Sequence, residues 1–242
     1  MHARTHDYLA DHAPAGTPVL PLAIAIEWFA AAGRAHQPDR ATSLRDIQVL
    51  HRVDLPDLAT GHRFTIEGGD ELRLVSPAGI AHYRARLAAP NGRTRPWTVP
   101  HGDHIDSIYD HSALFHGPRF QTLQRVDALS DSGADTCVVG IRDMGWPGGP
   151  WWTDAAAVDG ALQAAVLWAS HATGDATLPM GVDALHVHRA GPAPGPLRCL
   201  VLAGTIADGQ TRCDAVLLDA DGQPRAELFG VNLIRRPDLA SG

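Results

Sequence analysis

Two ionisable side chains occupy places in the sequence where a base and an acid could act on one substrate. His12 lies in a loop of small residues shortly before an apolar run that opens at Pro21. Asp159 lies inside a second apolar run. A histidine titrates near neutral pH and is a common general base, whereas a carboxyl group among apolar side chains is partly desolvated, which raises its pKa and favours the acid form. The pair could remove a proton from one carbon and protonate a leaving group on the next.

The residue four positions after Asp159 is Gln163, and this spacing suggests how the acid is held. Residues four apart in a helix lie on one face, so the Gln163 amide can hydrogen-bond the carboxyl group and orient it. Each residue also has a structural explanation. A lone histidine in a loop is more often a solvated bystander, and a buried carboxyl group can be satisfied by a backbone N–H. Spacing alone therefore leaves both roles open.

The helices that must position these residues occur once in each half of the chain. A helix that is apolar on nearly all sides is predicted over 21–33, with proline in its first turn and Gly33 as its stop. A second apolar helix is predicted over 155–174. A helix of this kind is wrapped by other structure, so each half needs a sheet around its helix.

Runs of alternating polarity, bounded by Gly, Pro or Asp, predict antiparallel strands in both halves. They lie at 46–55, 62–69, 71–79, 80–89, 119–129, 135–144, 182–190, 197–207, 211–220 and 224–236. Two copies of a buried helix with a sheet predict two similar subdomains, 1–90 and 105–242, joined by a Pro- and Gly-rich linker at 91–104.

Composition excludes several classes of partner. The 242 residues carry a net charge of −7, so no general basic field attracts nucleic acid or an anionic membrane. The three cysteines are too few and too scattered for a disulfide framework. No apolar run is long enough to span a membrane, and the N-terminus lacks the apolar core of a signal peptide. We therefore expect a cytoplasmic protein with no nucleic-acid or membrane partner.

Several histidines lie close together in and after the predicted linker, at His101, His104, His111 and His116. They lack the paired cysteine or carboxylate spacing of a zinc site. We therefore predict no metal site.

Four motifs, taken in order, resemble those of dehydratase domains from polyketide synthases and related fatty-acid synthases. His12-x3-Gly16-x4-Pro21 matches the HxxxGxxxxP motif of this family, and the Asp159 and Gln163 pair matches its DxxxQ/H motif. "LFHGPRFQTL" at 114–123 is similar to the family's GYGPxFQ tract, and "TLPMGVDAL" at 177–185 to its Leu-Pro segment. The resemblance extends over essentially the whole chain and is closest to dehydratases of iterative, enediyne and polyunsaturated-fatty-acid synthases.

The resemblance implies an α+β double hotdog fold, in which two antiparallel sheets each wrap a long central helix. It also implies elimination of water from a β-hydroxyacyl thioester to give an α,β-enoyl thioester. In that reaction His12 would take the α-proton, and Asp159, held by Gln163, would protonate the leaving hydroxyl. Besides Gln163, the implied substrate-binding residues are Gly16, Pro21, Gly117, Pro118 and Phe120. Gly16 would let the thioester oxygen approach backbone N–H groups at the start of the first helix.

The resemblance implies no cofactor of the protein's own, because the acyl chain arrives on the phosphopantetheine of an acyl carrier protein. The implied partners are this carrier protein, the other synthase domains and a second copy of the chain in a homodimer. Arginine groups at 93–97 and 234–238 could meet an acidic carrier protein.

Two other readings stay open at this point. A double-bond isomerase or cyclase could use the same His12 and Asp159, and a non-catalytic acyl-binding or scaffold domain could keep the fold without the reaction. The chain also departs from the family at two positions. His116 stands where many members have tyrosine, and Leu22 stands where glycine often follows the proline of the first motif.

Overall fold

A computed structural model of the chain describes residues 1–36, 43–89, 96–110 and 113–236. The first five residues of the predicted linker, 91–95, and His111 therefore lie outside the described residues. The last two residues of that linker belong to a short strand, β5 (Asp103–Ile105).

In the described part of the chain, 11 strands form one antiparallel sheet in the order β2-β3-β4-β1-β8-β11-β10-β9-β7-β6-β5. Those of the N-terminal half are β1 (Ser43–Val49), β2 (Thr65–Gly68), β3 (Glu71–Val75) and β4 (Ala81–Ala88). After β5 follow β6 (Leu123–Ser130), β7 (Gly133–Val138), β8 (Thr177–Val187), β9 (Leu197–Ala207), β10 (Gln210–Leu218) and β11 (Pro224–Arg235).

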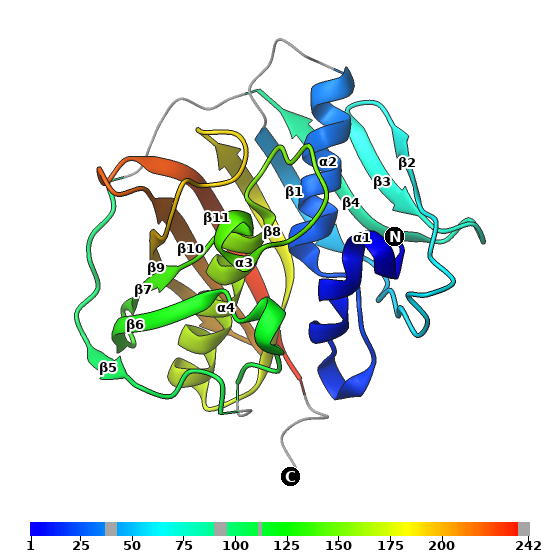
Figure 1. Cartoon of the computed structure of the whole chain (residues 1–242). Helices are drawn as coiled ribbons and strands as arrows, with labels where there is room; N and C mark the ends of the chain where they lie inside the picture. The colour runs from blue at the N-terminus through cyan, green and yellow to red at the C-terminus, as the bar shows by residue number, and fades with distance from the viewer. Residues whose placement is uncertain (37–42, 90–95, 111–112, 237–242) are drawn as a thin grey trace.

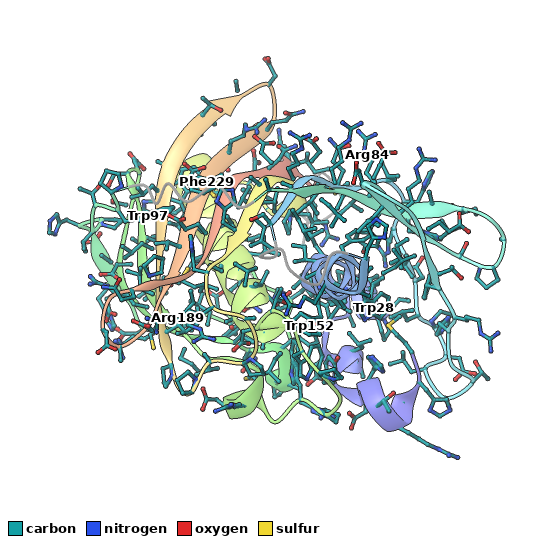
Figure 2. The ribbon with its side chains drawn as sticks, turned by 90° about the horizontal axis from the view of Figure 1, so that it is seen from above. Trp28, Arg84, Trp97, Trp152, Arg189 and Phe229 are labelled. Carbon is teal, nitrogen blue, oxygen red and sulfur yellow. The ribbon has the colours of Figure 1, made fainter. Side chains whose placement is uncertain are left out.

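The two halves meet where β1 pairs with β8, with Ser43 opposite His186 and Gln48 opposite Gly181. Two long helices, α2 (Leu22–His36) and α4 (Ala155–Thr173), contact each other on the concave side of the sheet (Figure 1). Viewed from above, α2 is seen almost end-on beneath the arch of the N-terminal strands (Figure 2). This is the double hotdog arrangement, with each half of one continuous sheet curved around its own helix.

The helix α2 begins directly after Pro21, whose carbonyl accepts hydrogen bonds from Ile24 and Ala25. Nearly all of its first nine side chains are buried, as expected of a helix wrapped by other structure. The prediction that Gly33 ends the helix is wrong, because α2 continues to His36. Gly33 instead allows close packing, since a Cβ there would lie 2.6 Å from Cδ2 of Leu87 on β4.

The helix α4 occupies the predicted range, and Gly174, at φ 72°, follows its last residue. Its first turn is capped by Asp154, whose side chain accepts hydrogen bonds from the backbone N–H groups of Ala157, Ile141 and Ala193. Because these donors come from three segments, the cap fixes where α4 starts relative to the loops around it.

A buried glutamate on α2, Glu27, connects the two halves. Its carboxylate accepts the N–H of Trp152 at 2.7 Å and both the N–H and the hydroxyl of Thr153 at 2.6 Å. Trp152, in turn, lies near the helices in Figure 2, and the Arg34 guanidinium is 5.5 Å from the centre of its ring. The loop that leads into α4 is therefore fastened to α2.

Several predicted strand limits are wrong. The first strand ends at Val49 rather than at residue 55, and residues 118–120 form a 3-10 helix, η3 (Pro118–Phe120), ahead of β6. The run 135–144 splits into β7 and a short helix, α3 (Ile141–Met144), because Gly140 precedes a turn that the Asp154 carboxylate caps. Strand β8 starts at Thr177, earlier than predicted, and includes the Leu-Pro segment.

Two further short helices precede α2 in the chain. They are α1 (Ala3–His6) and the 3-10 helix η1 (Asp7–Asp11), followed by a 3-10 turn, η2 (Pro14–Gly16). No helix in the described residues is long and apolar enough to cross a membrane.

Candidate active site

His12 follows η1 directly and is held by the backbone of the loop that it opens. Its N–H donates to Leu9 O, and its ring Nδ1 lies 3.0 Å from Val19 O. Val19 N–H returns a bond to His12 O at 2.9 Å, so the loop between them is closed on itself. A carbonyl oxygen can only accept, so Nδ1 carries the proton and Nε2 keeps its lone pair.

The side chain of His12 is 9% exposed, and this burial lowers its pKa to about 4. The hydrogen bond to Val19 O opposes that shift without cancelling it. His12 is therefore neutral at neutral pH, with Nε2 free to accept a proton.

Asp159 lies on α4, where the apolar surroundings that the sequence indicated are present. Burial raises the pKa of its carboxyl group to about 7, although a hydrogen bond from Gln163 Nε2 to Oδ2, at 2.7 Å, acts in the opposite direction. Between a pH of about 4 and a pH of about 7, the Asp159 carboxyl group therefore keeps its proton while His12 is neutral.

Gln163 is fixed on both sides of its amide. Its Nε2 lies within hydrogen-bond distance of Phe120 O at 2.7 Å and Thr122 Oγ1 at 3.0 Å, besides Asp159. Its Oε1 accepts the hydroxyl of Tyr109 at 2.6 Å, and that hydroxyl oxygen accepts Leu123 N–H at 2.9 Å. Since the amide oxygen is engaged by a donor, the amide nitrogen has to face the carboxyl group.

Sequence reasoning missed Tyr109, because no spacing links it to Asp159. It lies in the segment before the tract at 114–123, and only the fold brings it to Gln163. A second residue that was missed is Asp11. Its backbone oxygen accepts Gly117 N–H at 2.8 Å and its carboxylate accepts Arg119 N–H at 2.7 Å, so it fastens the C-terminal tract to the segment that carries His12.

His116 is buried beside both His12 and Asp159. Its Nε2 lies 3.9 Å from Asp159 Oδ2, and its ring centre lies 5.4 Å from that of His12. Burial, with the charge of His12 as a smaller cause, holds the pKa of His116 well below its usual range. The sequence marked this position as a departure from the family but predicted no role for it.

One cavity brings these groups together. His12, His116, Asp159 and Gln163 line it, along with Leu162 and Val166 one and two turns along α4. Other parts of the wall come from the segment that leads into α2, the segment at and after the end of β1, Tyr83 of β4, the segment before His116, and the adjoining ends of β8 and β11. The cavity therefore lies between the two halves, with His12 from one half and Asp159 from the other.

The other predicted substrate-binding residues are Gly16, Pro21, Gly117, Pro118 and Phe120, and none of these five described residues belongs to the cavity lining. Gly16 is exposed, at φ 81°, and its N–H donates to Ala13 O, which gives it the role of a turn. Pro21 precedes α2, and Gly117 packs on Asp11, where a Cβ would come within 2.8 Å of the carboxylate carbon. Phe120 supports the site through its carbonyl bond to Gln163.

Leu22, the second departure from the family, does line the cavity. Three arginines line it as well: Arg52 and Arg235, whose side chains are about half exposed, and Arg236, which is buried. Within the described residues, no group of three or more His, Cys, Asp or Glu side chains is arranged to hold a metal ion.

Comparison with protein families identifies two matches. The family described as "Polyketide synthase dehydratase N-terminal domain" matches residues 98–241, and that described as "Polyketide synthase dehydratase domain" matches residues 1–73. No curated protein matches the chain.

Solved structures share the fold at low sequence identity. The dehydratase domain from the CurJ module of curacin polyketide synthase is 16% identical, with a TM-score of 0.77 over 99% of this chain and 91% of that one. The dehydratase domain of PpsC from Mycobacterium tuberculosis, in complex with C12:1-CoA, is 20% identical, with a TM-score of 0.73 over 95% and 89%. A trans-acyltransferase polyketide synthase enoyl-isomerase is 12% identical, with a TM-score of 0.72 over 93% and 94%. These likenesses confirm the double hotdog fold.

Proposed function

Because the chain belongs to the polyketide synthase dehydratase family, we propose that it dehydrates a β-hydroxyacyl thioester on an acyl carrier protein, with His12 as base and Asp159 as acid. Dehydration in polyketide synthesis is the reaction of the family. The carrier-bound substrate and the roles of the two residues are what the proposal adds.

The observation that carries the proposal is the pair of protonation states in one cavity. A base has to start neutral and an acid has to start protonated. The pKa values of about 4 for His12 and about 7 for Asp159 supply both states in the interval between them. In the proposed step, His12 Nε2 takes the α-proton of the substrate. The β C–O bond then breaks as the Asp159 proton joins the leaving oxygen, which releases water.

The three arginines of the cavity lining support a carrier-bound substrate. A phosphopantetheine arm carries a phosphate, and carrier proteins present an acidic surface, so guanidinium groups are suited to both. Arg235 is the most accessible to test, because its side chain is 57% exposed and, among the described residues, forms an ion pair with Asp175. We expect Arg235→Ala to raise KM for a carrier-bound substrate more than for the same acyl chain on pantetheine.

The proposal is tested by incubating the protein with a β-hydroxyacyl chain on carrier protein and following loss of water by mass. We expect His12→Ala and Asp159→Asn each to lower the rate by about 10²–10⁴-fold, the usual contribution of a general acid or base. His101→Ala and Asp131→Asn are matched controls, since both residues are exposed, and we expect them to leave the rate unchanged.

Absence of water loss in the wild type, and of hydration of the matching enoyl thioester, would refute the dehydratase activity. Binding of the acyl carrier without turnover would instead favour the scaffold reading. A shift of the double bond from the α,β to the β,γ position, followed by NMR, would favour the isomerase reading. Rates in both variants equal to the wild type would refute the assignment of His12 and Asp159.

We also propose that the protein works without a cofactor of its own and as a homodimer, as the resemblance to the family implies. Activity that survives treatment with EDTA and exhaustive dialysis would support the first part. Sedimentation at micromolar concentration tests the second, and a monomer at all concentrations would contradict it.

A further inference from the structure

The proposed elimination leaves the site in the wrong protonation state for another turnover. His12 ends as an imidazolium and Asp159 as a carboxylate, whereas the reaction has to start from a neutral imidazole and a carboxylic acid. In every cycle His12 therefore has to lose one proton and Asp159 has to gain one. Among the described contacts there is no hydrogen bond between these two side chains, so a direct transfer has no path, whereas a group placed between them offers one.

His116 is placed between them. Its Nε2 faces Asp159 Oδ2 at 3.9 Å, and its ring is tilted 57° to that of His12 at a centre-to-centre distance of 5.4 Å. The side chain is 7% exposed, and among the residues that the structure describes its Nδ1 is buried without a hydrogen-bond partner. Leaving a buried polar nitrogen without a partner costs free energy, so a structural role alone does not account for an imidazole here.

The ring is held by groups that do not use its nitrogens. Phe115 stacks on it at 4.2 Å with a 19° interplanar angle, and Gln121 Nε2 donates to His116 O at 3.1 Å. Asp11 fastens the following residues, Gly117 and Arg119, to the segment that carries His12. Packing and backbone contacts thus fix the ring beside both reactive residues while Nδ1 and Nε2 remain available for proton transfer.

We propose that His116 is the relay that returns the proton from His12 to Asp159 after each elimination, an inference that rests on the proposed function. The proton on His12 Nε2 passes to the lone pair of His116 Nδ1, while the proton on His116 Nε2 passes to Asp159 Oδ2. His12 becomes neutral, Asp159 becomes a carboxylic acid, and the His116 proton has moved from one nitrogen to the other. The water released in the reaction then accepts the Nδ1 proton and donates one to Nε2, with no net change.

The direction of this transfer agrees with the environment of the three groups. A proton on a group with a pKa of about 4 moves downhill to one with a pKa of about 7. His116, with its pKa well below the usual range, does not retain the proton at neutral pH. The separations of the resting site exceed hydrogen-bond length, which is common for proton-transfer groups before the substrate closes the site.

The test compares His116→Phe with His116→Tyr, two variants of nearly equal shape that differ by one hydroxyl group. Each is measured in a single turnover, with protein in excess of β-hydroxyacyl carrier, and in the steady state. Because His116→Phe removes the return path but leaves His12 and Asp159, we expect its first turnover to stay within about threefold of wild type. Its steady-state rate should fall about tenfold or more, after a burst of about one product per protein molecule.

The hydroxyl of His116→Tyr can accept one proton and give up another, so we expect it to restore most of the steady-state rate. In His116→Ala, added imidazole should raise the steady-state rate and leave the first turnover unchanged. Thermal unfolding curves establish that the variants are folded, and His116→Tyr keeps the test available if the smaller variants are not.

Two results would overturn the relay while the proposed function stands. One is a steady-state rate of His116→Phe equal to wild type. The other is an equal loss in the first turnover and the steady state, with no recovery in His116→Tyr or with imidazole, since that pattern belongs to a side chain that only shapes the cavity. A wild type that shows no water loss in either experiment refutes the proposed function, and the relay with it.

Discussion

In the N-terminal half the proposed base, His12, lies outside the long helix, whereas in the C-terminal half the proposed acid, Asp159, lies inside one. The loop backbone holds His12, through reciprocal bonds with Val19. Asp159 is held by a side chain, Gln163, which is itself held by Tyr109, Thr122 and the Phe120 carbonyl. The position of His12 therefore depends on the backbone of its loop. The position of Asp159 depends on a series of hydrogen-bonded side chains.

This difference indicates where each half is sensitive to substitution. A hydrogen bond to a backbone carbonyl survives most changes of neighbouring side chains, so the position of His12 should tolerate them. The network around Asp159 spans three segments of the C-terminal half, so a distant side chain can alter the orientation or pKa of the acid. Glu27 connects the two halves, so its substitution should affect both of them.

The largest effect is expected at the connection between the halves. Glu27→Ala leaves two backbone N–H groups and one hydroxyl of the loop before α4 without their acceptor, and we expect it to lower the free energy of unfolding by about 3–5 kcal/mol. Urea unfolding measures this change. The control is Glu67→Ala, which removes an exposed carboxylate from β2 and should change stability by less than about 0.5 kcal/mol. Equal effects of the two substitutions would contradict the role of Glu27.

The pH profile of kcat/KM should have two limbs. The acidic limb depends on His12 in the N-terminal half, and the alkaline limb depends on Asp159 in the C-terminal half. His12 must be neutral, so kcat/KM should fall below a pH of about 4, and Asp159 must be protonated, so it should fall above a pH of about 7. Above that value the rate should drop tenfold per pH unit, which gives about a hundredfold loss at pH 9. Asp159→Asn should abolish the upper limb in its residual activity, and an upper limb that persists in this variant belongs to another group.

The same two groups affect stability in definite directions. The pKa of Asp159 is raised on folding, so the native state binds more protons and loses stability as the pH rises from about 4 to about 7. The pKa of His12 is lowered on folding, so its contribution is full above about 6.5 and is lost as the pH falls to about 4. The two opposite slopes overlap at mildly acidic pH, so only the single variants separate them.

The next effect tests whether the acid depends on a remote side chain. Tyr109→Phe removes the donor that fixes the Gln163 amide, and we expect kcat to fall about tenfold, the cost of a lost buried hydrogen bond of about 1.5 kcal/mol. The upper limb of the pH profile should shift as well, because the orientation of Gln163 affects the Asp159 carboxyl group.

Tyr8→Phe is the control, because Tyr8 is fully buried, whereas Tyr109 is partly buried, and the Tyr8 hydroxyl has no hydrogen-bond partner among the described residues. We expect it to leave kcat unchanged and stability unchanged or slightly higher. A similar kcat in Tyr109→Phe and Tyr8→Phe would show that the acid does not depend on the Tyr109 hydroxyl.

The smallest effect compares the two glycines that pack a helix onto the sheet. In Gly33→Ala the new Cβ meets the flexible end of Leu87, and the better helix propensity of alanine offsets that strain, so stability should stay within about 1 kcal/mol and activity unchanged. In Gly160→Ala it meets Val138 Cβ at 3.0 Å and Thr122 Oγ1 at 3.1 Å, next to Gln163. We expect a loss of about 1–3 kcal/mol in stability and a several-fold loss in kcat. Equal activity of the two variants would contradict the proposed sensitivity of the acid.

The sequence predicted the parts of the molecule that follow from local patterns. Both long helices were predicted because a nearly all-apolar run has to be buried. The predicted limits of α4 agree closely with the structure, in which Asp154 caps the first turn and Gly174 follows the last residue. Gly33 was misread, because a glycine that ends a helix and a glycine that packs against Leu87 look the same in a sequence. Strand limits failed where a turn depended on a distant partner, as Ile141 does on Asp154.

The sequence by itself determined the residue types of the site: a histidine before one buried helix, and a carboxyl group with a glutamine one turn later on another. Periodicity places Asp159 and Gln163 on one face, and apolar neighbours raise the pKa of the acid, so these properties are local. Tertiary structure decided which groups meet. It brought Tyr109, Asp11 and His116 to the two motif residues and left Gly16, Pro21, Gly117, Pro118 and Phe120 outside the cavity lining. The physical reason is that contacts between the halves depend on the pairing of β1 with β8 and on the packing of α2 against α4, which no short stretch of sequence encodes.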